Sequence, residues 1–270
     1  MSRELRSTYI KLKGLSYRKG VLVLHIVFLG TGAAGAPPGR AESCLLVETA
    51  RTRILLDCGS GCSTRLEALS ITPCDIDAII VTHLHVDHYA GIFGLAVRAS
   101  AHACPRFPLL MVHHSILEES KLEFQRLLPR SWRDRVKVTG IDGAYVIGDV
   151  AVKLVPAEHS IPCWSIILES DGALMLYTSD TRPCPSSLQS YLSRADLVVH
   201  EATLPSNLPR AAIETGHSTV TEAISCRKFM REDAILALTH LTLESERELR
   251  AWRVLPRHVL IASDNTFYSL

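Results

Sequence analysis

Side-chain amides are scarce in this 270-residue chain, which has two Asn and two Gln. Lysine is also rare beside arginine, at 7 residues against 22. Few amides fit selection for heat, and a GC-rich genome would raise Arg and lower Asn and Lys in the same way. The composition therefore leaves a heat-adapted source as one of two explanations.

The chain also lacks an excess of charge of either sign. Its 29 Lys+Arg and 28 Asp+Glu give a net charge of +1, which excludes a surface that is basic throughout but leaves a local basic patch open. Hydrophobic residues make up 47%, so disorder and collagen-like repeats are excluded. We find no linker, low-complexity tract or short repeat and expect one compact domain over residues 21–270.

No pair of the eight cysteines has C-x-x-C spacing, which argues against a zinc ribbon. Scattered cysteines in a chain of this length are usually reduced and buried. That indicates the cytoplasm, with the disulfides of thermophile proteins as the alternative.

The apolar run VLVLHIVFLG (21–30) follows a leader, residues 1–20, that holds six Lys/Arg and one Glu. This order resembles a signal peptide, but the run is too short to span a bilayer and reads as a buried strand. Its removal would delete a strand and a glycine turn, so we expect neither export nor a membrane partner. The leader interleaves basic residues with tyrosines, as nucleic-acid surfaces do; a disordered segment or an extra edge strand is the alternative.

Strand and helix patterns alternate along the whole chain and indicate an α/β class. The expected strands are 21–29, 44–48, 53–57, 78–82, 108–112, 150–155, 164–169, 173–178, 196–200, 234–239 and 258–263. The expected helices are 63–69, 89–101, 115–127, 185–193, 219–231 and 244–253. Thr219 and Glu222 form the capping-box pattern that starts a helix.

The segment Gly30-Thr-Gly32-Ala-Ala-Gly35 fits the dinucleotide pattern G-x-G-x-x-G. That chemistry needs a helix to open within the motif, so that its N-terminus faces the pyrophosphate. Ala36-Pro37-Pro38-Gly39 follows and cannot continue such a helix. We therefore interpret the segment as a glycine turn that leaves a strand.

The strongest signal is VTHLHVDH (81–88), which follows a β-rich run. Imidazole and carboxylate are ligands that suit zinc and similar divalent ions. His83 and His85 could bind one ion, and Asp87 and His88 a second about 3.5–4 Å away. A surface cluster of hydrogen-bonded histidines is the alternative, but three histidines and an aspartate within six residues favour a metal site.

At this point the chain resembles the metallo-β-lactamase superfamily, whose signature is H-x-H-x-D-H after a hydrophobic strand. The resemblance implies a four-layer αβ/βα sandwich over nearly the whole chain. FLGTG (28–32) matches the first strand and turn, and LLDCGSG (55–61) the segment in which Asp57 would stand behind a ligand histidine. His159, Asp180 and His240 match the third ligand histidine, the bridging aspartate and the last ligand.

Two further segments are similar to ribonuclease Z and its phosphodiesterase relatives, namely H-E-A-T (200–203) and H-S-T (217–219). Lactamases and glyoxalases generally lack this pair. In the relatives the histidine of H-S-T lies by the scissile phosphate and the glutamate orients it, which gives His217 and Glu201 here. A charged imidazole can stabilise the phosphorane or protonate the leaving oxygen.

One departure concerns the arm that clamps tRNA in ribonuclease Z, usually inserted between the third histidine and the bridging aspartate. His159 and Asp180 are 21 positions apart, which leaves room only for a hairpin with the turn Asp171-Gly172. This puts tRNA as the substrate in doubt. The cyclic ribose-phosphate phosphodiesterase of phosphonate breakdown also lacks the arm, but its extra cysteine zinc site has no counterpart here.

The resemblance implies a binuclear zinc phosphodiesterase that cleaves RNA or small, cyclic or linear phosphodiesters by attack of a metal-bridged hydroxide. His83, His85 and His159 would hold one ion, Asp87, His88 and His240 the other, with Asp180 bridging. Asp87 would also orient or deprotonate the nucleophile. A lactonase-type hydrolase and a non-catalytic binding module on the same fold are the alternatives, and a homodimer stays open. The remaining histidines, among them His25 and the pair His113-His114, are expected in the core or on solvated loops.

Overall fold

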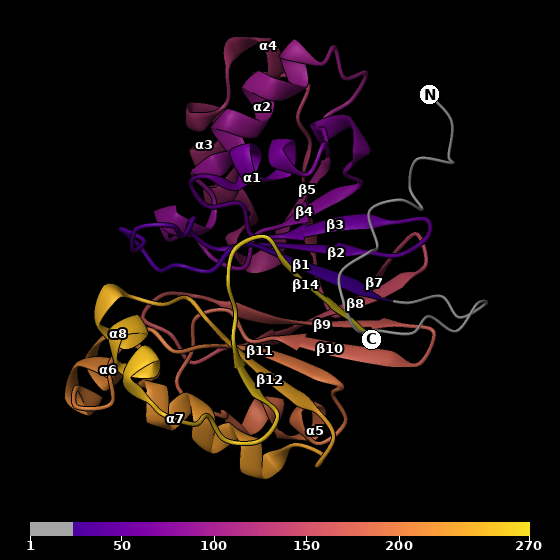
Figure 1. The fold of residues 1–270 in the computed structure, drawn as a ribbon. Helices are drawn as coiled ribbons and strands as arrows, with labels where there is room; N and C mark the ends of the chain where they lie inside the picture. Colours follow the sequence, from indigo (N-terminus) through magenta and orange to yellow (C-terminus); the bar gives the residue numbers. More distant parts are fainter. Residues whose placement is uncertain (1–23) are drawn as a thin grey trace.

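The structure, a computed structural model, describes residues 24–270. In this part of the chain the strands form two seven-stranded sheets that face each other, and helices cover their outer sides (Figure 1). Helices α1–α4 lie on the side of the first sheet and α5–α8 on the side of the second. This arrangement confirms the predicted four-layer αβ/βα sandwich. The leader predicted at residues 1–20 lies outside the described residues.

The first sheet has the order β14-β1-β2-β3-β4-β5-β6. Its strands are β1 (His25–Gly30), β2 (Cys44–Glu48), β3 (Arg53–Leu56), β4 (Ala78–Ile80), β5 (Leu109–His113), β6 (Val138–Ile141) and β14 (Thr266–Ser269). The pairs from β14 to β3 are antiparallel, and those from β3 to β6 are parallel.

The second sheet has the order β13-β12-β11-β10-β9-β8-β7 and the same division. Its strands are β7 (Ala144–Ile147), β8 (Val150–Pro156), β9 (Trp164–Ser170), β10 (Ala173–Tyr177), β11 (Leu197–Glu201), β12 (Ile235–Thr239) and β13 (Val259–Ile261). Strands β7 to β10 pair antiparallel, and β10 to β13 pair parallel. Each sheet therefore has one edge at which several parallel strands end together.

The helices are mostly short. They are α1 (Cys62–Ala68), α2 (Gly91–Ala101), α3 (Leu117–Leu127), α4 (Arg130–Arg133), α5 (Gln189–Leu192), α6 (Pro209–Thr215), α7 (Val220–Ser225) and α8 (Leu243–Ala251). The capping box predicted at the start of α7 is present, since Thr219 and Glu222 exchange hydrogen bonds. The glycine segment after β1 opens no helix, which agrees with its reading as a turn.

Every predicted strand overlaps an observed one, but β6, β7 and β14 were not predicted. Strand β6 contains a threonine and a glycine, which break its apolar run, and β7 is an apolar run of only four residues, three of which are exposed. The helix predicted at 185–193 is wrong in extent, because a 3₁₀ turn takes its first part and α5 has four residues. The helix predicted at 219–231 ends early, at Ser225.

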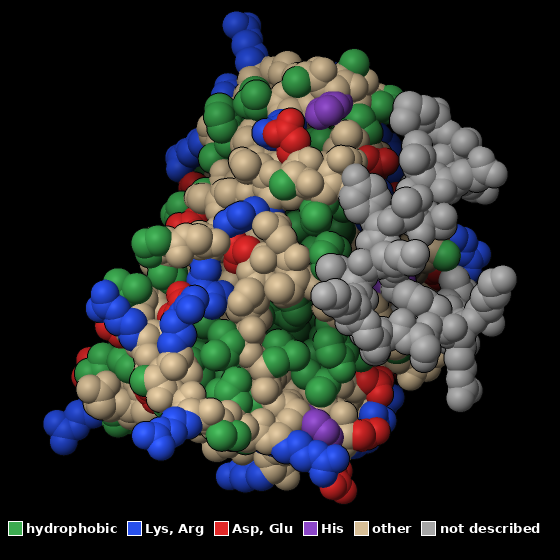
Figure 2. All heavy atoms as spheres, viewed as in Figure 1, with side chains coloured by type: hydrophobic (Ala, Val, Ile, Leu, Met, Phe, Trp, Pro, Cys, Tyr) green, Lys and Arg blue, Asp and Glu red, His purple; other side chains and the backbone are tan. Residues whose placement is uncertain are grey.

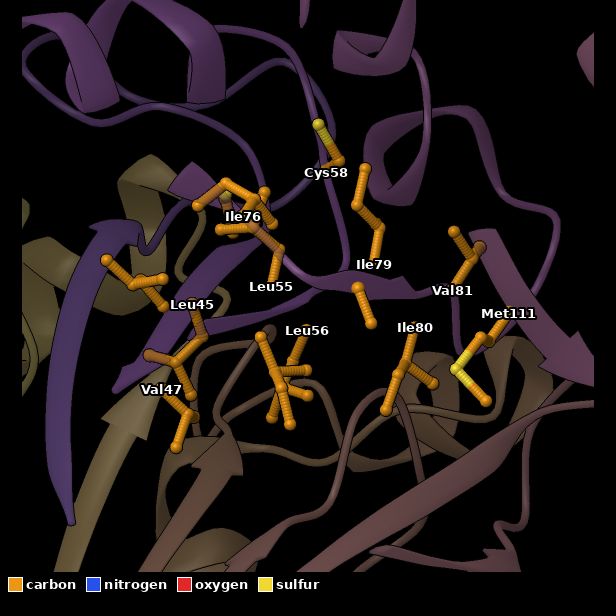
Figure 3. Close-up of a cluster of buried hydrophobic side chains, with 14 of the residues drawn as sticks. Leu45, Val47, Leu55, Leu56, Cys58, Ile76, Ile79, Ile80, Val81 and Met111 are labelled. Atoms are coloured by element: carbon orange, nitrogen blue, oxygen red, sulfur yellow. The ribbon is translucent and has the colours of Figure 1, made fainter. Parts of the chain in front are cut away.

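The core lies between the two sheets and continues under the helices of each side. In the first half, Leu56 and Ile80 point from neighbouring strands toward the second sheet (Figure 3). A second cluster under the other layer of helices includes Leu176, Val198 and Leu236. Because both faces of the central strands are buried, these strands are continuously apolar, as expected for parallel sheets covered on both sides.

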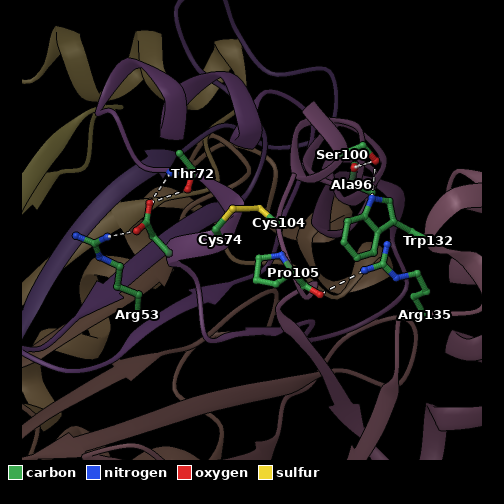
Figure 4. The surroundings of a disulfide bond; sticks show 10 residues. Arg53, Thr72, Cys74, Ala96, Ser100, Cys104, Pro105, Trp132 and Arg135 are labelled. Carbon is green, nitrogen blue, oxygen red and sulfur yellow. Dashed lines mark hydrogen bonds and ion pairs between the residues drawn. A yellow bond between two sulfur atoms is a disulfide. The ribbon is translucent and has the colours of Figure 1, made fainter. Parts of the chain in front are cut away.

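Six cysteines form disulfide bonds, which corrects the expectation that they are reduced. The pairs are Cys44–Cys62, Cys74–Cys104 and Cys184–Cys226, with Cα–Cα distances of 5.9, 5.2 and 5.6 Å. Cys58 and Cys163 are free and buried. The bond Cys74–Cys104 joins the segment before β4 to the segment after α2 (Figure 4). The partners are distant in sequence, and spacing alone does not give such pairings.

No helix of the described part is long and apolar enough to cross a membrane. On the face drawn in Figure 2, Lys and Arg side chains lie among acidic ones and are spread over both halves. This distribution matches the near-neutral net charge.

Candidate metal centre

The predicted site residues gather where parallel strands end. In the first sheet, Asp57 follows β3 and His83 lies just beyond β4. In the second, Asp180 and His240 come just after β10 and β12, and Glu201 is the last residue of β11. The carboxyl ends of parallel strands form one edge of each sheet, the usual place for a site in α/β proteins. Side chains from the two edges are in contact.

Two glycines allow the loops of the first edge to pack backbone against backbone. A Cβ at Gly59 would lie 2.1 Å from the carbonyl oxygen of Asp87, and one at Gly91 would lie 2.1 Å from the carbonyl oxygen of Gly59. Any other residue would push the two loops apart. The D-C-G segment therefore positions the H-x-H-x-D-H loop.

Three histidines and an aspartate form the first group of potential ligands. Nδ1 of His85 lies 3.2 Å from Nε2 of His83 and 3.0 Å from Nε2 of His159. Oδ2 of Asp180 is 3.6 Å from Nε2 of His83. Burial lowers the pKa of His83 and of His159, so these imidazoles are neutral at pH 7 and their lone pairs are free to bind a cation.

The second group consists of Asp87, His88 and His240, and Asp180 lies between the two groups. Nε2 of His240 is 3.1 Å from Oδ2 of Asp87 and 3.3 Å from Nε2 of His88. Asp180 places Oδ2 3.3 Å from His88 and Oδ1 3.5 Å from His240. Burial alone would lower the pKa of His88, but Asp180 and Asp57 raise it well above its usual value. A pocket that favours a proton between two carboxylates also suits a metal cation.

The residues present fit divalent cations. Oδ1 of Asp180 is buried and accepts no hydrogen bond within the described part of the chain, a costly state for a carboxylate oxygen unless a cation binds it. Imidazole nitrogens also face one another at 3.0–3.3 Å. All seven predicted ligands thus lie in two adjoining groups; their assignment as ligands remains a prediction.

Asp57 accepts hydrogen bonds from both sides of the site. Its carboxylate accepts Nδ1–H of His88 at 2.7 Å and the hydroxyl of Tyr177 at 2.9 Å. The backbone N–H and hydroxyl of Thr82 also donate to it, and that hydroxyl lies 3.0 Å from Nδ1 of His83. Asp57 is fully buried and has a left-handed backbone, with φ of 59°. One carboxylate therefore orients one histidine directly and another through a hydroxyl.

Glu201 and His217 form a hydrogen-bonded pair beside Asp180. Nδ1 of His217 donates to Oε1 of Glu201 at 2.9 Å, and Oδ2 of Asp180 is 4.0 Å from the same nitrogen. The Glu201 carboxylate also accepts the backbone N–H groups of Thr181, Thr203 and Ser218. Burial alone would lower the pKa of His217, but Glu201 raises it to about 9. The imidazole is thus held in its charged form.

Sequence reasoning missed two residues that position this pair. The hydroxyl of Thr203 lies 2.8 Å from Nδ1 of His240 and donates to Glu201, so it links the pair to a predicted ligand. Arg182 donates to the carbonyl oxygen of His217 and pairs with Glu222 at 2.5 Å. Thr203 lies inside the H-E-A-T segment, so the sequence carried a signal for it, whereas Arg182 lies two residues after Asp180 and outside the segments singled out.

The other histidines lie outside these groups. His25, on β1, places its Nδ1 2.8 Å from the hydroxyl of Ser269, on β14. His200 is buried, and its Nδ1 lies 2.7 Å from the carbonyl oxygen of Glu201. His113 is the last residue of β5, His114 follows it, and both lie near Asp142.

Comparisons with known proteins give a family and several relatives. The profile of the family described as "Anti-Pycsar protein Apyc1" matches residues 24–241. Ribonuclease Z of Pyrobaculum neutrophilum is 29% identical over 287 residues, which cover 90% of this chain and 96% of that protein. Zinc phosphodiesterase ELAC protein 2 of Mus musculus is 28% identical over 258 residues, which cover 81% of this chain and 30% of that protein.

Among solved structures, the metallo-β-lactamase fold protein YhfI from Bacillus subtilis superposes with a TM-score of 0.78 at 22% identity. The match covers 92% of this chain and all of that one. The fold is therefore the metallo-β-lactamase fold.

Proposed function

The chain belongs to the family of the anti-Pycsar protein Apyc1, and from this premise we propose that it is a binuclear zinc phosphodiesterase resembling ribonuclease Z. One relative is named a ribonuclease and another a zinc phosphodiesterase, so by name both cleave phosphodiester bonds and the second uses zinc. The two groups of histidines and aspartates on either side of Asp180 support two ions.

The observation that carries the proposal is the Glu201–His217 pair next to the metal groups. Because Glu201 holds Nδ1 of His217, the proton on Nε2 is the one left for a substrate. A buried imidazolium there can stabilise charge on phosphorus oxygens or protonate a leaving alkoxide. The segments that supply this pair, H-E-A-T and H-S-T, are similar to those of ribonuclease Z and its phosphodiesterase relatives, which speaks against the lactonase alternative.

We assign His83, His85 and His159 to one ion, Asp87, His88 and His240 to the other, and Asp180 to both. Two zinc ions bound there would lower the pKa of a water molecule and neutralise charge on a phosphate. Asp87 has a second role in this proposal: its ionised carboxylate would also orient or deprotonate the nucleophile. Burial would raise its pKa, but its hydrogen bond with His240 and the neighbouring imidazoles lower it to about 2.

The substrate side of the proposal rests on the hairpin between His159 and Asp180. Strands β9 and β10 are joined only by the turn Asp171-Gly172, so this part of the chain carries no arm. We infer that small, cyclic or unstructured phosphodiesters are cleaved and that folded pre-tRNA is bound weakly. A net charge of +1 offers no general electrostatic substitute for the arm.

The proposal also covers the domain organisation, the compartment and the assembly. Residues 21–270 act as one hydrolase domain, as the pairing of the last strand, β14, with the first, β1, supports. The cytoplasm is the proposed compartment; three disulfides do not exclude it, because intracellular proteins of hyperthermophiles are rich in disulfides. A homodimer is the proposed assembly, and sedimentation of the purified chain tests it.

A hydrolysis panel on the zinc-loaded protein tests the function. It holds an activated phosphodiester, cyclic nucleotides, a short single-stranded RNA, pre-tRNA and a lactone, each with wild type and with Asp180→Ala. We expect turnover of the diester and of at least one small or unstructured phosphodiester, and none with the variant. Turnover of the lactone alone would overturn the phosphodiesterase assignment. Efficient, tight-binding 3′ cleavage of pre-tRNA would overturn the inference from the missing arm.

A further inference from the structure

A second cluster of metal-ligating side chains lies on the edge of the first sheet that carries the catalytic groups. His113 is the last residue of β5, His114 follows it, and Asp142 follows the last residue of the neighbouring parallel strand β6. Their ligand atoms all lie within 4.8 Å of one another. None of the three belongs to the groups around Asp180.

The distances suit a tetrahedral ion. Nε2 of His113 lies 3.9 Å from Oδ1 of Asp142, and Nδ1 of His114 lies 3.6 Å from Oδ2. Ligands placed about 2.0–2.1 Å from a tetrahedral zinc are about 3.3 Å from one another. In the first group of potential ligands, Oδ2 of Asp180 lies at similar distances, 3.6 Å from Nε2 of His83 and 3.9 Å from Nε2 of His159. The cluster is thus about as compact as a group that we assign to a metal.

His113 is held in an orientation that leaves Nε2 available. Its ring stacks on Trp164, with centroids 4.1 Å apart and planes inclined by 14°. Its Nδ1 accepts the backbone N–H of Ser115 at 3.3 Å and lies 2.9 Å from the hydroxyl of the same residue. An ion on Nε2 requires the other tautomer, in which Nδ1–H donates to that hydroxyl and the long backbone bond is given up, as the second ring nitrogen of a metal-bound histidine normally donates to a nearby oxygen.

A glycine keeps the other two groups within reach. A Cβ at Gly140, on β6, would lie 3.1 Å from Cα of His114, so the bare backbone lets the two strand ends approach. Gly143, with φ of 67°, turns the chain directly after Asp142. Burial and the neighbouring His114 lower the pKa of His113, so its imidazole is neutral at pH 7.

We propose that His113, His114 and Asp142 form a third binding site, for an exchangeable transition-metal ion such as Zn²⁺, Ni²⁺ or Cu²⁺. Two imidazoles and a carboxylate are ligands for these ions and leave a fourth position open to water. The His114 and Asp142 side chains are 55% and 74% exposed, so the ion exchanges with solvent and binds more weakly than ions in the buried groups. The alternative is a pair of simple contacts between histidines and a carboxylate that bind no metal.

Metal titration of the holoprotein distinguishes a metal-binding site from contacts that bind no metal. Protein holding two zinc ions per chain is titrated with Zn²⁺ and with Ni²⁺ by calorimetry, and with Cu²⁺ by electron paramagnetic resonance. We expect one further ion per chain and nitrogen coupling in the Cu²⁺ spectrum. His114→Ala and Asp142→Asn should each weaken this binding at least tenfold. His102→Ala, another exposed histidine on the same half, is the matched control and should leave it unchanged.

Absence of a third ion in the wild type at millimolar metal, or tight binding that survives in both variants, would overturn the site. The initial zinc content of two per chain is measured first for every variant. An initial content below two ions per chain would count against the proposed catalytic ligands. The third ion is counted only as metal bound in addition to the initial content, so the two proposals can fail separately.

Discussion

The two groups of predicted ligands around Asp180 differ in the hydrogen-bond partners of the ring nitrogens that face away from the metal position. In the first group Nδ1 of His83 lies 3.0 Å from the Thr82 hydroxyl, and Nδ1 of His159 lies 2.9 Å from the carbonyl oxygen of Gly216. Both partners are neutral. In the second group His88 meets the Asp57 carboxylate at 2.7 Å.

The second group also has a carboxylate of its own among its predicted ligands, Asp87. A negative partner behind an imidazole raises its basicity, and a charged ligand adds direct attraction for a cation. We therefore expect the ion held by Asp87, His88 and His240 to be bound more tightly than the ion held by the three other histidines. Stepwise release of zinc to a chelator measures this difference.

The largest effect is expected from Asp180→Ala, which removes a carboxylate that lies within 3.6 Å of imidazoles of both groups. Zinc content should fall from about two per chain to one or fewer, and phosphodiester turnover to background. Elemental analysis of untreated protein measures the first and a nitrophenyl diester assay the second. Two retained ions with wild-type turnover would show that Asp180 is not a bridge.

His217→Ala should separate metal binding from chemistry. The variant keeps every predicted ligand, so its zinc content should stay normal while turnover of diesters with poor leaving groups falls by about 10²–10⁴. The deficit should shrink with nitrophenolate, which needs little protonation. An equal loss for good and poor leaving groups would point instead to charge stabilisation or binding.

Asp57→Asn should act unequally on the two groups. It removes the negative charge next to His88 but reaches His83 only through Thr82. We expect zinc affinity of the tighter ion to fall by about 10–100-fold, as for other lost partners of ligand histidines, which brings the two release steps together. Asp149→Asn is the matched control, a carboxylate that accepts two threonine hydroxyls away from the site. Equal weakening of both ions would contradict the comparison.

The smallest effect is expected from Tyr177→Phe. The substitution removes one of the donors to Asp57 and leaves the ring in the core. Loss of such a hydrogen bond costs about 1 kcal/mol of unfolding free energy, which denaturant unfolding of the metal-free protein can measure. Zinc affinity should change by less than in Asp57→Asn. A larger loss of affinity would mean that Tyr177, not His88, is the main partner of the carboxylate.

Much of this centre could be predicted from the chain alone. H-x-H-x-D-H is a local pattern, and a strand followed by a tight loop brings its side chains to one end of a sheet whatever surrounds them. The start of α7 was predicted correctly for the same reason, since the Thr219–Glu222 exchange is complete within four residues. Helix α6 was missed although Pro209 and Gly216 mark its two ends.

Other features depend on which segments meet. Strand β14 pairs with β1 across the length of the chain, and its own four residues, TFYS, are too few and too exposed to predict a strand. The cysteine pairs join positions 18, 30 and 42 residues apart, and three of many combinations are realised because only those side chains face each other in the folded chain.

The sequence by itself determined the α/β class, the resemblance and the residue types of the site, because hydrophobic periodicity and ligand spacing are local properties. Only the tertiary structure decided that Asp57 serves two histidines, that Thr203 links His240 to Glu201, and that Asp142 comes near His113 and His114. These contacts join side chains far apart in the chain. Their distances are set by the packing of two sheets and by the register of parallel strands, which no short segment contains.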